Sequence, residues 1–212
     1  IAQQRSILYI QMTCRTDDPE KAKAYQDFVE TVDPAVRAMA DQLDRKMIEL
    51  VDSLPFEAPR FAVYFRKMRS DIEIFRDVNI PLQTQESLLS RDYQAVTGAM
   101  MVLFQGAEYP VPRMRKFYED PDPTVRQTAW EATSERFLQD RDRLNEIFEA
   151  MIALRDEIAR NSGFPNYRDY KFREYHRFDY TPELCRDYHE AVEKHLVPLA
   201  RQMHQLRAQQ MD

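Results

Sequence analysis

The sequence comes closest to a catalytic motif between His189-Glu190 and Glu193. Zinc peptidases use H-E-x-x-H on one helix, where two histidines bind the metal and the glutamate acts as general base. Here Glu193 stands where the second histidine is needed. His195 falls on a different helical face, because six residues turn a helix by about 240° relative to His189. Exposed polar side chains on an amphipathic helix are therefore the favoured interpretation.

Other catalytic signatures are missing from the sequence. Carboxylate-bridged di-iron and di-manganese bundles need E-x-x-H pairs on two helices, and no such pair occurs. There is no G-x-S-x-G nucleophile elbow. Only 3 glycines are present, so neither a G-x-G-x-x-G loop nor a P-loop can be written. The sequence therefore predicts no catalytic residue and no metal ligand in this chain.

Aromatic and basic side chains alternate in the segment that follows Gly163. Stacking on nucleic-acid bases is disfavoured, because acidic residues in the same segment nearly cancel its positive charge. Two interpretations stay open. The segment is either a packed helix junction with buried rings or one wall of a peptide cleft, where Tyr and Arg bind carbonyl and carboxylate groups. The candidate wall residues are Tyr167, Tyr170, Arg173, Tyr175, Arg177 and Tyr180.

The composition narrows the function classes further. A net charge of -6 argues against a nucleic-acid partner. The most apolar run, residues 95–104, is too short to span a bilayer, so no membrane partner is expected. There is no recognisable signal peptide, and the 2 cysteines are too far apart in sequence for a disulfide framework. We therefore predict a cytoplasmic protein.

Helical periodicity covers most of the chain and predicts an all-α fold of mostly long antiparallel helices. One β-prone window with a Gln-Gly turn predicts a small hairpin near residues 99–111. The helix that starts at Asp18-Pro19 is expected to be kinked at Pro34 and to end near Leu54, before Pro55. The other predicted helices cover residues 1–16, 61–75, 84–97, 113–118 and 123–161, and a last one starts at Thr181-Pro182.

The order of short motifs resembles the oligoendopeptidase F family, which comprises zinc metallopeptidases related to thimet oligopeptidase. No single motif is specific, but the five occur in order and at matching spacings. They are Asp122-Pro123-x-x-Arg126-x-x-Ala129, Leu154-Arg155-x-x-Ile158-Ala159, Ser162-Gly163-Phe164-x-Asn166-Tyr167-x-x-Tyr170, Arg177-x-Asp179-Tyr180-Thr181 and Val192-Glu193-Lys194-His195-x-Val197-Pro198-Leu199.

The resemblance implies a helical shell around a channel that admits short peptides, with zinc bound by H-E-x-x-H. This sequence lacks that motif, which in the family follows the helix of the Val-Pro-Leu motif. The resemblance thus implies the N-terminal half of a larger enzyme: residues 1–112 as a helical region ending in the hairpin, and 113–212 as the start of the catalytic domain. Zinc belongs to the full-length parent and is not bound by this chain.

Two functions are compatible with the sequence. The first is a fragment of a zinc metallo-oligopeptidase, inert alone, whose partners are short peptides and the missing C-terminal half of the same polypeptide. The second is a non-catalytic helical interaction or scaffold protein. A fragment should leave apolar side chains exposed at both ends, and we expect this of Ile7, Leu8 and Ile10 and of Leu196, Leu199 and Met203.

Overall fold

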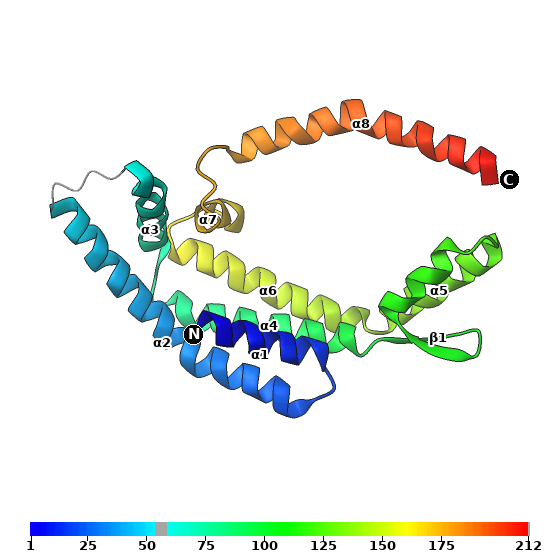
Figure 1. Ribbon diagram of the computed structural model, residues 1–212, viewed down its shortest axis with the longest axis horizontal. Helices are drawn as coiled ribbons and strands as arrows, with labels where there is room; N and C mark the ends of the chain where they lie inside the picture. Colours follow the sequence, from blue (N-terminus) through cyan, green and yellow to red (C-terminus); the bar gives the residue numbers. More distant parts are fainter. Residues whose placement is uncertain (54–58, 212) are drawn as a thin grey trace.

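The computed structural model describes residues 1–53 and 59–211, and most of these are helical (Figure 1). The α-helices are α1 (Ala2–Cys14), α2 (Pro19–Ser53), α3 (Ala62–Ile74), α4 (Asn79–Gly98), α5 (Pro123–Gln139), α6 (Arg141–Asn161), α7 (Tyr167–Glu174) and α8 (Pro182–Met211). The short 3-10 helix η1 (Pro59–Phe61) precedes α3, and a second one, η2 (Val111–Glu119), follows the hairpin. The all-α class is confirmed. Leu54 and Pro55, where the second helix was expected to end, lie outside the described residues.

The predicted hairpin is present as strands β1 (Met101–Phe104) and β2 (Ala107–Pro110), paired antiparallel. Its turn residues Gln105 and Gly106 both have positive φ, 50° and 78°, as a two-residue hairpin turn requires. On its inner face Val102 and Phe104 pack with Met114 of η2 and Ala129 of α5. The hairpin is therefore held in place by packing against η2 and α5.

A buried polar junction joins α3, α4 and α6. The side-chain amide of Asn79 donates to the Ile158 carbonyl at 3.1 Å and to Ser162 Oγ at 3.0 Å. Ser162 Oγ in turn donates to the Ile74 carbonyl at 2.9 Å. The most extensive packing between two described elements is that of α4 against α6. These helices come from opposite sides of the domain boundary predicted at residue 112. The division of the chain at 112 remains a prediction.

The N-terminal helix α1 lies along the first half of α2. Met12, Tyr25 and Val29 form the buried contact between them. Arg5 Nε donates to Asp33 Oδ2 at 2.7 Å, so the buried Asp33 carboxylate is paired. Pro34 lies inside α2, which continues through it as one helix.

Two predicted boundaries are wrong. The periodic stretch over 123–161 is two helices, because Asp140 leaves the helical conformation with φ −100° and ψ 8°. Helix α4 begins at Asn79 and not at residue 84, because Pro81 falls in the first turn, where its missing N–H has no helical partner.

Helix α8 has no extensive packing contact with any other described element. Figure 1 shows it as an arch separated from α6 along most of its length. Leu196, Leu199 and Met203 are 54%, 53% and 61% exposed, as expected. At the other end Ile7 and Ile10 are exposed, whereas Leu8 is partly buried against the contact of α1 with α2. No helix of the described chain is both long and apolar enough to cross a bilayer.

Candidate functional site

The candidate wall residues all lie on α7 and the turn that follows it. Gly163 has φ +85°, the conformation that ends a helix, and so terminates α6. Asn166 then caps α7, since its side-chain oxygen accepts the Asp169 N–H at 3.0 Å. After α7 the chain turns at His176, whose φ is 53°. One side of α7 faces the core through Tyr170, and another side lines a pocket through Arg173.

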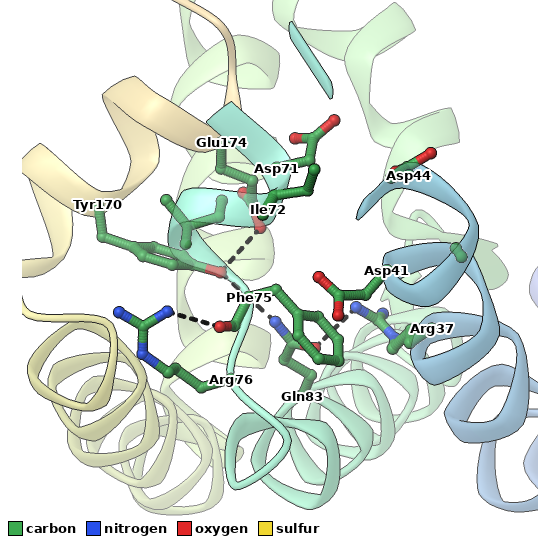
Figure 2. Close-up of a pocket in the computed structure, with 12 residues that line it drawn as sticks. Arg37, Asp41, Asp44, Asp71, Ile72, Phe75, Arg76, Gln83, Tyr170 and Glu174 are labelled. Carbon is green, nitrogen blue, oxygen red and sulfur yellow. Dashed lines mark hydrogen bonds between the residues drawn. The ribbon is translucent and has the colours of Figure 1, made fainter. Parts of the chain in front are cut away.

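Tyr170 points inward and is 3% exposed. Its ring packs against Ile74, Ile158 and Ala159. Its hydroxyl accepts a long hydrogen bond from Gln83 Nε2 at 3.4 Å and donates to Glu174 Oε1 at 3.5 Å (Figure 2). Burial, with a smaller contribution from the Glu174 charge, raises the pKa of Tyr170 to about 12. Tyr170 is thus a neutral hydrogen-bonding group at physiological pH.

Tyr167 lies beside Tyr170, with ring centroids 5.8 Å apart in a stacked arrangement. Its hydroxyl donates to Glu86 Oε1 at 3.4 Å, and the same carboxylate accepts from Arg155 Nε at 2.7 Å. Burial and the Glu86 charge raise the pKa of Tyr167. Lys171 completes this network through its ion pair with Glu174. Burial alone lowers the pKa of Lys171, but the hydrogen bond and charge of Glu174 outweigh it and raise that pKa.

Tyr170 separates two pockets. The larger, of about 260 Å³, lies between α2, α3, α4 and α7, and Figure 2 shows the side chains around it. The smaller, of about 150 Å³, lies toward Glu86 and Tyr167. Both are lined by Arg37, Gln83, Tyr170 and Glu174.

A third pocket, of about 320 Å³, lies on the other side of α7. Arg173, Arg177 and Tyr180 all line it. The Arg177 guanidinium is 5.0 Å from the Phe172 ring centroid and 5.8 Å from that of Tyr180. Cations stacked on aromatic rings in this way can bind carboxylates or carbonyls without rearranging.

The structure thus divides the candidate wall residues into two groups. Tyr167 and Tyr170 sit at a packed helix junction, while Arg173, Arg177 and Tyr180 line an open pocket. Tyr175 is 57% exposed, and Lys171 Nζ and Arg177 Cζ lie 5.0 Å and 5.3 Å from its ring centroid.

Of the residues that line the pocket in Figure 2, only Tyr170 was a candidate from the sequence. The polar residues that were missed include Arg37, Asp41, Asp44 and Gln83. They occur on long amphipathic helices, where polar residues ordinarily mark the solvated face. No local signal distinguished them.

Three solved structures resemble the chain. An oligoendopeptidase F covers 98% of the chain with 24% identity and a TM-score of 0.87. PZ peptidase A, solved with an inhibitor, covers 93% with 26% identity and a TM-score of 0.84. An oligoendopeptidase F from Bacillus anthracis covers 93% with 23% identity and a TM-score of 0.82. Residues 117–212 match the family model of peptidase family M3. The resemblance to oligoendopeptidase F is confirmed.

The oligoendopeptidase F-like chain spans just over a third of these structures, 37%, 35% and 36% of their respective lengths. No curated protein matches the sequence significantly. The M3 match begins within η2 and includes α5 to α8, while the structural likeness extends over α1 to α4 as well.

The described residues do not fit the zinc ion that the M3 family implies. Nowhere in the described chain do three or more His, Cys, Asp or Glu side chains come together in a way that could hold a metal. His189 and Glu193 are exposed on α8, which has no extensive packing contact with any other described element.

Proposed function

We propose that the chain is the N-terminal, pre-catalytic part of a zinc metallo-oligopeptidase that hydrolyses short peptides inside a helical channel. The match of residues 117–212 to peptidase family M3 carries this proposal. In it the zinc, the general base and the rest of the channel belong to the C-terminal part of the same polypeptide. This chain supplies one wall and has no hydrolytic activity alone. Two cysteines that are free in the structure suit a cytoplasmic enzyme.

The surface we assign to the channel is the 320 Å³ pocket beside α7. Arg173 and Arg177 offer guanidinium donors there, and Tyr180 offers a hydroxyl. These groups can hold a peptide's carbonyl oxygens or its terminal carboxylate. Tyr167 and Tyr170 contribute indirectly, since their packing fixes the position of α7.

The test compares the 212-residue chain with the natural protein that contains it. Quenched fluorescent peptides are supplied to both, with and without a zinc chelator. We expect chelator-sensitive hydrolysis by the natural protein and none by the chain. Hydrolysis that survives chelation, or its absence from both proteins, contradicts the proposal.

The wall assignment is tested in the same natural protein. Arg177→Ala should raise KM several-fold with little change in kcat, because it removes binding that is equal in the ground and transition states. Arg115→Ala is the matched control, since the Arg115 side chain is 84% exposed and its ion pair with Glu119 is long, at 3.9 Å. Equal KM values for the two variants would remove Arg177 from the wall.

The alternative is a non-catalytic helical interaction protein. It is favoured by the apolar side chains exposed along α8, where Leu184 and Leu206 are 52% and 60% exposed. A natural protein without peptidase activity that forms a stable complex through α8 would support this alternative.

A further inference from the structure

Four carboxylates and two arginines line the pocket shown in Figure 2. Its carboxylates come from three helices: Asp41 and Asp44 from α2, Asp71 from α3 and Glu174 from α7. Apolar side chains of α2 and α3, including Ile72, also line the pocket. The lining therefore has more acidic than basic side chains, next to an apolar surface.

Part of this charge is already neutralised. Glu174 is paired with Lys171, and Asp71 Oδ1 lies 2.8 Å from His176 Nε2. Asp41 Oδ2 accepts from Arg45 Nε at 2.7 Å. Of the two arginines that line the pocket, Arg37 donates to Gln83 and Arg76 donates to backbone carbonyls.

Asp41 and Asp44 both keep carboxylate oxygens without a partner among the described residues. The Asp41 side chain is only 10% exposed, and its Oδ1 is buried with no hydrogen bond to any described residue. Figure 2 shows this carboxylate pointing into the pocket. Asp44 has neither a hydrogen bond nor an ion pair within the described chain. A buried carboxylate oxygen without a donor is costly, so a ligand that supplies one is favoured.

A metal ion does not suit these carboxylates, because no three acidic or histidine side chains in the described residues converge to hold one. An organic cation does not need such convergence. A guanidinium has five N–H donors directed outward in a plane, and an ammonium has three. The pocket offers such a group the carboxylates of Asp41 and Asp44, and it offers the alkyl stem the apolar side chains of Ile72 and Phe75.

We propose that this pocket binds the guanidinium or ammonium end of a basic side chain, with Asp41 and Asp44 accepting its N–H donors. That the side chain belongs to a peptide rests on the proposed function, whereas the cation site rests on the pocket alone. Burial, together with the charges of Asp71 and Asp41, raises the pKa of Asp44. A bound cation stabilises the ionised form of Asp44. The affinity of the pocket for the cation should therefore fall as acid protonates Asp44.

The test is calorimetric titration of the 212-residue chain with N-acetyl-arginine methylamide. The matched probe is the citrulline compound, which has the same shape without the charge. We expect the arginine probe to bind at least tenfold more tightly, and Asp44→Asn to weaken its binding about tenfold. Asp187→Asn on α8 is the control, because Asp187 is exposed and does not line the pocket.

Further arms identify the source of the cation. The N-acetyl-lysine methylamide probe presents a side-chain ammonium, and alanine methylamide presents only an α-amino group. Binding of the arginine or lysine probe supports the proposal, and binding of alanine methylamide alone overturns it. Asp41→Asn also removes the partner of Arg45, so its fold is checked by circular dichroism.

Equal affinity of the arginine and citrulline probes without binding of the lysine probe, or unchanged affinity in Asp44→Asn, would overturn the cation site. The peptide assignment fails separately. If the chain binds the arginine probe but the natural protein hydrolyses no peptide, the cation site stands and the proposed function falls.

Discussion

At the scale of single residues, Tyr170 makes the stability of the chain depend on pH. Its pKa of about 12 lies above the ordinary value of about 10, so the unfolded chain releases this proton first. The contribution is therefore fully present below about pH 10 and is lost as pH rises toward 12. Two pKa units correspond to about 3 kcal/mol of unfolding free energy.

Replacing Tyr170 with Phe should remove this dependence. Near pH 8 the variant should lose about 1 kcal/mol or less, because it gives up only two long hydrogen bonds. By about pH 11 it should match or exceed the unmodified chain. Urea unfolding at both pH values measures the difference, with Tyr188→Phe as control because Tyr188 is 67% exposed. Parallel pH profiles for the two chains would refute this account.

At the scale of elements, local signals predicted where several helices begin and end. Asp122 caps α5, accepting the Thr124 N–H at 2.8 Å, with Pro123 at the first helical position. Gly163 ends α6, and Gln105 and Gly106 form the hairpin turn. These signals work because each is a property of a few adjacent residues.

The break at Asp140 could not be predicted in this way. Apolar residues recur at helical spacing on both sides of it, and neither Gly nor Pro marks the boundary. Helix α5 packs against the hairpin and η2, while α6 packs against α4 and α7. The two helices separate because they pack against different parts of the chain, which depends on tertiary structure.

Gly163→Ala tests the role of this glycine as a helix terminator. Its φ of +85° is strained for any residue with a Cβ, although no atom lies within 4 Å of the added methyl group. We expect a loss of about 1–2 kcal/mol in unfolding free energy, arising from the backbone alone. Gly163→Asn should cost less, since asparagine tolerates this conformation better. Equal costs, measured by chemical denaturation, would point to packing instead.

At the scale of the whole molecule, the sequence located only part of the candidate site. It identified the aromatic segment of α7, because that composition is unusual. It did not identify Asp41, Asp44 or Gln83, which α2 and α4 bring to the same pocket. Their proximity depends on how separate helices pack, and a pattern within one helix does not contain that information.

The arrangement of the molecule also predicts unequal local stability. Helix α8 lacks extensive packing, and Pro198 removes one of its internal hydrogen bonds. Most helical stability in proteins comes from burying an amphipathic face, and the apolar residues of α8 are exposed. Helices α4 and α6 pack extensively against each other, Ile147 and Ile158 of α6 are buried, and the Asn79 junction joins the two helices.

In the 212-residue chain, backbone amides of α8 should therefore exchange with deuterium at least a hundredfold faster than those of α6. An opening free energy lower by about 3 kcal/mol produces this ratio, and packed helices exceed frayed ones by that amount or more. Exchange followed by mass spectrometry resolves the two helices as separate peptides. Pro198→Ala should slow exchange within α8, because it restores the missing hydrogen bond, and should leave α6 unchanged. Similar protection of α8 and α6 would mean that α8 folds back onto the chain, and its exposed leucines would then have a partner within this polypeptide.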